Sequence, residues 1–312
     1  MKKFILKTAL FLLPIAILAI TMEYYLRQIP NNYSYKSTYL ERNSGDVQIL
    51  ILGSSHPYYG INPDYFSQHT FNASYVSQTL DLDFEIFNIY IEKFDNLRVV
   101  ILPVSYFTLW SKLTERGEPW RVKNYTLYYG INAKYPTDYS ELLNNKLGLS
   151  FQRLYRYLFE KKDDISCSMF GWGADYNSEN ADDLEKTGKI TALRHTYGDL
   201  YSKKNARIFA ENIDILNNFA KLCEQNNIKL IFLTMPVYRT YRENLNEAQL
   251  KKMIETMSGI VIKYENSSHI NWLEHADFVA GDFYDADHLN EIGAKKLSLK
   301  LASAIDSLGI LF

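Results

Sequence analysis

The amino-acid sequence predicts an α/β fold, a three-layer α/β/α sandwich around a mainly parallel sheet. Short apolar runs rich in β-branched residues recur along the 312 residues and are typical of buried strands. Helical patterns lie between these runs, and strands that alternate with helices form crossover units in a parallel sheet. One uncharged apolar segment at the amino terminus adds a predicted membrane helix in front of this domain.

The strand and helix patterns follow one another along the chain. The predicted strands are 47–53, 98–104, 229–236 and, more weakly, 269–274. Apolar residues at spacings of three and four predict helices over 76–94, 205–225, 245–265 and 290–307. Residues 106–200 break the alternation and are predicted to be an insertion of helices and loops within a domain of 46–312.

The amino terminus has the pattern of a signal anchor. Residues 1–7 carry three lysines, and residues 8–22 carry no charge. The apolar run ends in bulky residues rather than in the small residues that a signal peptidase needs, and Tyr24 and Tyr25 suit a membrane interface. We therefore predict a membrane anchor over 1–26, with a cleaved signal peptide as the second interpretation and a buried soluble helix as the third.

Charge flanking the anchor predicts its orientation. The positive-inside rule places the amino terminus in the cytoplasm, and a single pass through the cytoplasmic (inner) membrane then leaves the domain outside. Residues 27–45 are polar and are predicted to be a juxtamembrane linker.

Composition excludes some classes of function. The net charge is −2, and no basic stripe is present, so the sequence lacks the electrostatic signature of a nucleic-acid-binding protein. Cys167 and Cys223 have no partners at zinc-ligand spacing, so no metal site is expected, and the sequence does not establish a disulfide between them. Nothing in the sequence calls for an organic cofactor.

Polar residues with the chemistry of nucleophilic catalysis follow the first predicted strand and precede the last predicted helix. Ser54 and Ser55 come directly after residues 47–53, where sites of open parallel sheets gather. Asp285 and His288 lie three residues apart in a predicted loop before 290–307. An imidazole can take the proton of a serine hydroxyl while a carboxylate fixes its tautomer, so these residues predict a Ser–His–Asp triad.

These two elements together resemble the SGNH (GDSL-type) hydrolase superfamily. A Gly-x-Ser follows the first strand, and an Asp-x-x-His precedes the last helix. The second block of the family is similar to residues 72–79, which keep Asn72 but have Ser74 and Ser77 in place of glycines. In the third block, Ser105 stands where the family has an asparagine.

The resemblance implies a flavodoxin-like fold and a role for each matching residue. Ser55 would be the nucleophile, His288 the general base, and Asp285 the residue that orients the base. The oxyanion hole would use the backbone N–H groups of Ser55 and Ser77, with the Ser105 hydroxyl in place of the missing asparagine. Loss of one oxyanion donor can cost about 10²–10³ in rate, so these replacements favour a transferase or a slow enzyme over a fast esterase.

Other polar residues near the two elements are expected to have structural or pocket-lining roles rather than catalytic ones. We expect Ser54, His56, Asn72 and Tyr106 to form the wall of the pocket, and Ser54 to make local hydrogen bonds. His56 is not expected to be the base, because neighbouring residues that leave a strand point in different directions. Asp287 is expected to cap the last helix, and His195 to be structural.

The sequence thus predicts a membrane-anchored esterase or O-acyltransferase acting on ester-linked acyl groups of a cell-surface glycan. The family resemblance includes anchored proteins that transfer D-alanine to teichoic acids or acylate exopolysaccharides, which implies a membrane-bound O-acyltransferase as a possible partner. The alternative is a non-catalytic assembly or carbohydrate-binding subunit whose oxyanion hole has decayed.

Overall fold

The computed structural model describes residues 1–115, 117–133 and 135–310. The chain divides into two compact units, which are described separately. The N-terminal unit comprises residues 1–38 and 118–165, and the sheet unit comprises residues 39–117 and 166–312.

The sheet unit is built on a five-stranded parallel sheet with strand order β2-β1-β3-β4-β5. This is the flavodoxin-like order, so the predicted fold class is confirmed. The predicted strands are present, with ends shifted by a few residues, and β2 is a further strand that the sequence analysis missed. The strands are β1 (Ile49–Ile51), β2 (Thr70–Asn72), β3 (Val99–Pro103), β4 (Lys229–Thr234) and β5 (Ser267–Asn271).

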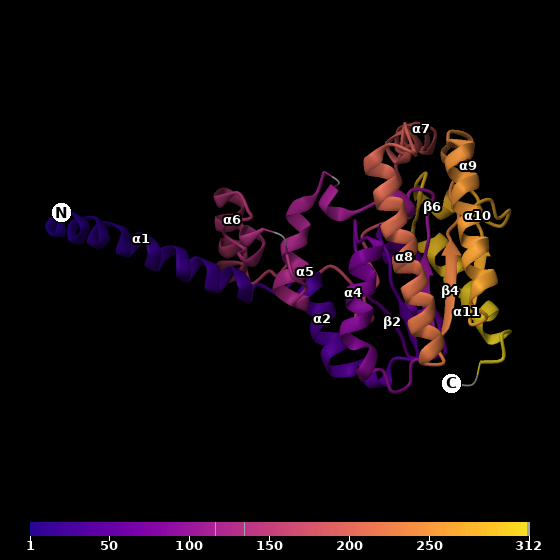
Figure 1. Ribbon diagram of the computed structural model, residues 1–312, viewed down its shortest axis with the longest axis horizontal. Helices are drawn as coiled ribbons and strands as arrows, with labels where there is room; N and C mark the ends of the chain where they lie inside the picture. The colour runs from indigo at the N-terminus through magenta and orange to yellow at the C-terminus, as the bar shows by residue number, and fades with distance from the viewer. Residues whose placement is uncertain (116, 134, 311–312) are drawn as a thin grey trace. The chain divides into compact units, whose positions relative to one another are not determined.

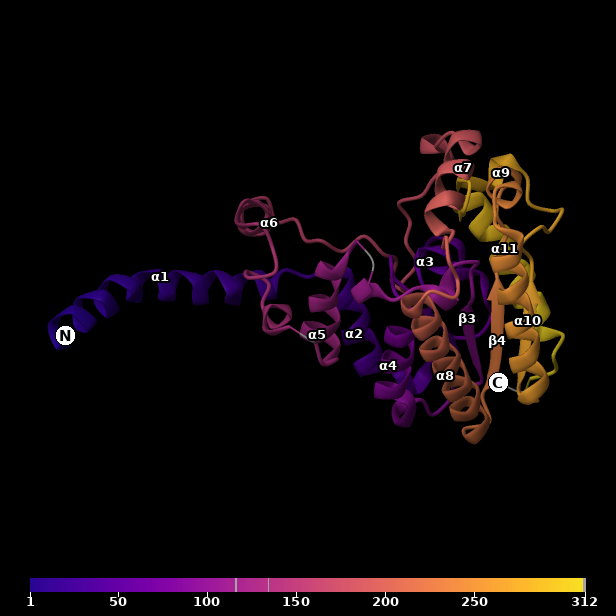
Figure 2. The same ribbon diagram turned by 45° about the horizontal axis from the view of Figure 1, so that its top comes forward.

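Helices cover both faces of this sheet (Figures 1 and 2). α4, α8 and α10 lie on one side, where Lys252 and Lys263 of α10 contact Phe209 and Asn217 of α8, and α11 lies on the other side. Alternate strand residues face α11, as the strand period of two requires; Ile49, Ile101 and Ile231 pack with Leu297 and Leu301 in one fully buried cluster. The helices of the unit are α3 (Ser55–Gly60), α4 (Leu80–Tyr90), α7 (Leu184–His195), α8 (Lys203–Gln225), α9 (Arg239–Glu243), α10 (Glu247–Lys263) and α11 (Glu291–Asp306).

A small antiparallel hairpin precedes α11, where the sequence predicted a loop. Its strands are β6 (Phe283–Asp285) and β7 (His288–Leu289), with Asp285 paired to His288. The Asp285 carboxylate accepts hydrogen bonds from the backbone N–H groups of Asp287 and His288, at 3.1 and 2.8 Å. This side chain closes the turn itself, so the hairpin forms without the alternating apolar pattern of a longer strand.

The N-terminal unit contains α1 (Lys2–Gln28), α5 (Val122–Tyr129) and α6 (Leu147–Phe159), and α2 (Asn32–Asn43) begins in it. Within the described residues, α1 is the one helix long and apolar enough to cross a membrane, and it continues through Pro14. No residue in the most apolar part of α1 is buried.

The predicted linker and insertion are more structured and differently divided than the sequence suggested. Residues 27–45 include α2, which begins where the Asn31 side chain accepts hydrogen bonds from the N–H groups of Tyr33 and Ser34. Of the predicted insertion, residues 118–165 belong to the N-terminal unit, whereas 106–117 and 166–200 pack into the sheet unit. Cys167 and Cys223 are both thiols, and no disulfide joins described residues.

Candidate active site

A strained turn presents Ser55 at the carboxyl end of β1. Gly53 has a φ of +112°, a conformation that residues with a Cβ rarely adopt, and a Cβ there would lie 3.0 Å from Pro57. The Gly53 N–H donates to Oδ1 of the buried Asp83 at 2.7 Å, which fixes the turn from the side of α4. Ser55 follows as the first residue of α3, half-buried.

The β6–β7 hairpin brings an imidazole to this serine. Nε2 of His288 lies 2.8 Å from Oγ of Ser55, and Nδ1 of His288 lies 2.9 and 3.1 Å from the two carboxylate oxygens of Asp285. Because the backbone N–H groups hold Asp285, its carboxylate is fixed behind the ring, and Nδ1 carries the proton that it accepts. The structure therefore joins the three residues that the sequence singled out into one hydrogen-bonded chain, Ser55–His288–Asp285.

A second chain of the same residue types lies beside the first. Nδ1 of His56 lies 2.7 Å from Oγ of Ser105, and Nε2 of His56 lies 3.0 Å from Oδ2 of Asp287. The two imidazole rings meet edge to face, with centroids 4.8 Å apart. His56 and Asp287 are both buried, so this chain is an interior network and His56 is not open to a pocket.

Electrostatics assign the protons of the second chain. Burial lowers the pKa of His56, against the opposing effect of Asp287, so the ring is neutral. Burial alone would raise the pKa of Asp287, but His288 and His56 hold it below its usual range, so the carboxylate is an anion. Nε2–H of His56 then donates to Asp287, which leaves Nδ1 to accept the hydroxyl proton of Ser105.

Asp287 also acts on His288. Burial works against a charged imidazole, but Asp287 and then Asp285 raise the pKa of His288 to about 9. The sequence-based interpretation of Asp287 as a helix cap is wrong, because the Asn290 side chain accepts from Ile292 N–H and Gly293 N–H at the start of α11. Asp287 is an interior anion shared between imidazoles.

The same residues offer donors of the type that bind metals. His56, Asp287 and His288 each present one possible ligand atom, and these atoms lie within 4.8 Å of one another. Direct hydrogen bonds already join His56 to Asp287 and His288 to Asp285, so the donors satisfy one another. This geometry fits a proton-sharing network better than a metal site.

Three tyrosine rings stack beside the Ser55–His288–Asp285 chain. Tyr176 lies between Tyr59 and Tyr284, with ring centroids 3.6 and 3.8 Å apart and planes nearly parallel. The edge of the stack faces His288, whose ring centroid is 5.4 Å from that of Tyr176. Tyr59 follows Ser55 on α3, Tyr284 belongs to β6, and Tyr176 comes from a loop, so the stack ties the serine, the hairpin and that loop together.

The remaining predicted site residues have varied surroundings. Asn72 is fully buried and bonds to Pro57 O and Ile61 O, and Tyr106 is also buried, with its hydroxyl bonded to Thr196 and to the Asn246 N–H. Ser54 precedes α3 and lines a cavity of about 10 Å³ beneath the Gly53 turn. Ser77 has a φ of +61°, the left-handed conformation that glycine adopts without cost.

Sequence reasoning missed the second chain and the tyrosine stack. Asp287 stands one residue before His288, and His56 one residue after Ser55, so the doubled pattern was present in the sequence. His195 extends the network, because its Nδ1 lies 2.9 Å from the Tyr241 hydroxyl and 3.9 Å from Asp287 Oδ2. The sequence around residue 195 does not indicate that His195 lies beside Asp287, because this contact depends on the packing of α7.

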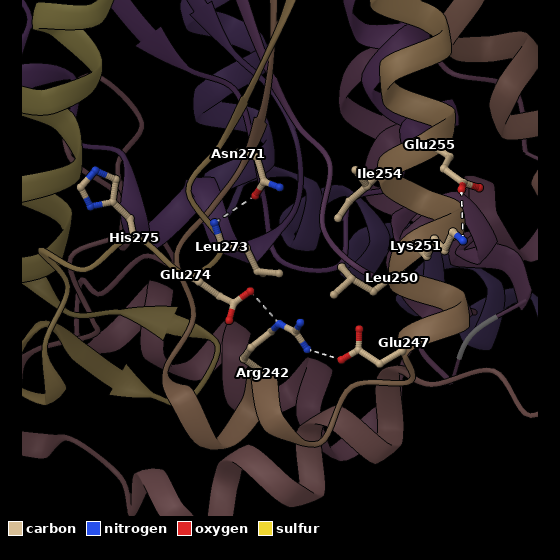
Figure 3. Close-up of a pocket in the computed structure, with 10 residues that line it drawn as sticks. All are labelled: Arg242, Glu247, Leu250, Lys251, Ile254, Glu255, Asn271, Leu273, Glu274 and His275. Atoms are coloured by element: carbon tan, nitrogen blue, oxygen red, sulfur yellow. Dashed lines mark hydrogen bonds and ion pairs between the residues drawn. The ribbon is translucent and has the colours of Figure 1, made fainter.

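A cavity of about 410 Å³ lies elsewhere on the sheet unit, between α10 and the segment after β5 (Figure 3). Arg242 lines it and forms ion pairs with Glu247 and Glu274. None of the residues that line it belongs to the Ser55–His288–Asp285 chain. The cavity is therefore separate from the candidate site.

The fold and these contacts define an α/β protein of flavodoxin-like strand order that carries an N-terminal apolar helix and a Ser–His–Asp hydrogen-bonded chain at the end of β1. The chain belongs to the family described as protein of unknown function (DUF1574), whose profile matches residues 132–292, just over half of the sequence. That region includes Asp285 and His288 but not Ser55. No curated protein matches the sequence.

Proposed function

We propose that this protein is a membrane-anchored, SGNH-like serine esterase or O-acyltransferase that acts on ester-linked acyl groups. The observation that carries the proposal is the 2.8 Å contact between Ser55 Oγ and His288 Nε2, with Asp285 fixed behind the ring. A hydrogen bond of this length lets the imidazole take the serine proton directly, which is the geometry that an activated nucleophile requires.

The reaction follows from that geometry in two halves. Ser55 Oγ attacks the ester carbonyl carbon while His288 Nε2 takes its proton, and Asp285 stabilises the imidazolium that forms. His288 then returns the proton to the leaving alcohol oxygen, which leaves an acyl group on Ser55. Water or a sugar hydroxyl attacks this acyl-enzyme with the same assistance from His288, and Ser55 is regenerated.

The oxyanion of each tetrahedral intermediate needs donors. As the first residue of α3, Ser55 has a backbone N–H without an acceptor inside the helix, and Ser77 has a left-handed backbone, which suits the glycine expected there from the family resemblance. We propose these two N–H groups as the oxyanion hole. Ser105 as a third donor requires its hydroxyl to leave His56, where its proton is already used.

The substrate and location complete the proposal. An anchor with three lysines before its apolar run would hold the catalytic domain outside the cytoplasmic membrane, where acylated glycans are found. A cleft that excludes water from the acyl-enzyme would make the protein a transferase, and one that admits water would make it an esterase. A membrane-bound O-acyltransferase is the partner that would supply acyl groups in the first case.

A serine-directed probe tests the proposal. The full-length protein in detergent is treated with a fluorophosphonate and, separately, with p-nitrophenyl acetate. We expect covalent labelling and turnover that are lost in Ser55→Ala and retained in Ser54→Ala, a matched control one residue away. Peptide mapping should place the label on Ser55.

Two results would overturn the catalytic proposal. One is the absence of labelling and turnover in a folded protein; the other is labelling that survives Ser55→Ala. Either would favour the alternative, a non-catalytic assembly or carbohydrate-binding subunit that retains the fold.

A further inference from the structure

Helix α6 of the N-terminal unit carries an apolar stripe that the unit leaves uncovered. Residues three or four apart lie on one face of a helix, and most of the exposed apolar residues of α6 follow that spacing. Phe151 is 55% exposed and Phe159 is 73% exposed, which is unusual for phenylalanine. The stripe consists of Leu147, Phe151, Tyr155, Leu158 and Phe159.

The neighbouring face of α6 packs on the end of α1. Leu154 is buried in a cluster with Met22 and Leu26, the two buried residues of α1, and with Ile29, which follows the helix. The stripe begins next to Leu154 on the helix surface, so it is continuous with this contact.

A polar clamp fixes the same end of α1 to the segment before α6. The Glu23 carboxylate accepts hydrogen bonds from the Ser140 hydroxyl at 2.8 Å and from the backbone N–H groups of Glu141 and Leu142 at 3.1 and 2.9 Å. Tyr24 and Tyr25 are exposed beside Glu23, in the manner of rings at a membrane interface. The first charged residue after the apolar run thus marks the level at which α1 leaves the membrane.

The orientation of α6 is that of a helix lying along the membrane surface at this level. In both views, α6 runs across the axis of α1 rather than along it (Figures 1 and 2). A helix that crosses a spanning helix at the point where the latter leaves the membrane lies along the membrane surface. We infer that α6 is an interfacial helix, with the stripe from Leu147 to Phe159 buried in the lipid of the membrane that α1 crosses.

An interfacial position for α6 is favoured because the apolar surface of α1 continues onto α6. An amphipathic helix lying in the interface buries its apolar face about 5–10 Å into the boundary between headgroups and acyl chains. Apart from Lys7 and Thr8, the exposed residues of α1 from Phe4 to Ile20 are apolar and require the same lipid environment. One lipid surface therefore covers both helices, and α6 fixes the tilt and height of the N-terminal unit against it.

Site-specific fluorescence tests this inference. In a background of Cys167→Ser and Cys223→Ala, the full-length protein carries Phe151→Cys or Leu149→Cys labelled with the fluorophore NBD. Leu149 is the matched control, because it is also an exposed apolar residue of α6 but lies on the opposite side of the helix. The labelled proteins are reconstituted into vesicles of phosphatidylcholine and phosphatidylglycerol.

We expect the label at residue 151 to be quenched by lipids that carry a nitroxide, more strongly when the nitroxide is near the headgroup than near the chain end. Dithionite added outside should reduce the label at residue 149 much faster than the label at 151. Tyr155→Cys should behave as Phe151→Cys does, which guards against a local effect of one substitution. Equal access of dithionite to residues 149 and 151 overturns the inference. So does a label at 151 that is shielded from dithionite but not quenched by lipid, because that result means a protein covers the stripe.

Discussion

Oδ1 of Asp287 lies 3.5 Å from Nδ1 of His288, is buried, and has no hydrogen-bond partner among the described residues. The hydrogen bond to Nδ1 belongs to Asp285 instead, so Asp287 contributes charge to His288 without orienting it. The two carboxylates near the imidazole therefore have separate effects: Asp285 sets its tautomer, and Asp287 raises its proton affinity. This separation makes the pH dependence of the proposed reaction informative.

The first prediction concerns that pH dependence. His288 must be neutral to take the Ser55 proton, and its pKa is raised to about 9, so kcat/KM for p-nitrophenyl acetate should rise with pH up to that region. Asp287→Asn removes the charge, and the apparent pKa of the profile should fall by about 1–3 units. Rates of Ser55→Ala, measured in parallel, correct for hydrolysis by hydroxide.

A comparison with Asp285→Asn separates charge from orientation. This variant removes the acceptor that fixes the tautomer, so the rate should fall by up to about 10⁴-fold at every pH. Asp287→Asn should instead retain a substantial rate at pH values above the lowered apparent pKa of His288. If both variants lose activity equally with unchanged apparent pKa values, Asp287 has no separate electrostatic effect on the base.

The second prediction distinguishes two roles for Ser105. If its hydroxyl proton is held by His56, Ser105→Ala leaves a buried ring nitrogen unpaired and should lower the free energy of unfolding by about 1–3 kcal/mol, with little change in kcat. If the hydroxyl turns to the oxyanion, kcat should fall by about 10²–10³. Urea unfolding and ester turnover of the same preparation decide between them, with Ser54→Ala as the control for loss of a neighbouring hydroxyl.

The third prediction concerns the carboxyl that holds the Gly53 turn. Burial raises the pKa of Asp83 to about 7, although Gln78 and the Gly53 N–H donate to it. A raised pKa means that the folded protein binds this proton more tightly than the unfolded chain. Its stabilising effect is therefore complete below the ordinary pKa of 3.8 and is lost as the pH rises through about 7.

Asp83→Asn removes that titration. Between the two pKa values, the free energy of unfolding of the wild type should fall, relative to the variant, by about 1.4 kcal/mol per pH unit. Denaturant unfolding of both proteins across this range provides the measurement. Parallel curves for the two proteins would mean that Asp83 is already ionised in the folded state.

Much of the fold could be predicted because the central strands have a strong local signal. Residues 99–103 and 230–233 are buried and form unbroken apolar runs, which are typical of parallel strands covered on both faces. β2 has only Phe71 as an apolar residue, and the β6–β7 hairpin depends on the Asp285 side chain, so neither leaves an apolar pattern. The division of residues 106–200 between two units depends on long-range packing that periodicity does not report.

The candidate site was only partly predictable for a related reason. Ser55, Asp285 and His288 lie in two short segments at opposite ends of the sequence, and their residue types and spacing suffice to single them out. The contacts of His56 and Asp287 are fixed by how the β1–α3 turn meets the β6–β7 hairpin in space. For adjacent residues such as Asp287 and His288, rules based on sequence spacing do not predict where each side chain points.

The N-terminal unit has a cluster of charged side chains around Glu141 that is buried, unlike ion pairs on the surface. The Glu141 carboxylate is 1% exposed and accepts hydrogen bonds from Lys123 Nζ at 2.6 Å, Arg153 at 3.0 Å and the Tyr128 hydroxyl at 3.0 Å. Lys123 is also buried, and burial lowers its pKa despite Glu141. Such a pair is costly to break, because removing one partner leaves a buried charge uncompensated.

The fourth prediction is that Glu141→Gln destabilises the N-terminal unit by about 3–5 kcal/mol, whereas Glu118→Gln, at the more exposed ion pair with Arg121, costs about 0–1 kcal/mol. Hydrogen exchange of the α5 amides in the full-length protein measures this, since α5 carries Lys123. The double variant Glu141→Gln/Lys123→Met should recover part of the loss, because it removes the stranded ammonium group as well. If the double variant is less stable than Glu141→Gln alone, the cost comes from the lost contacts of Glu141 and not from the uncompensated charge of Lys123.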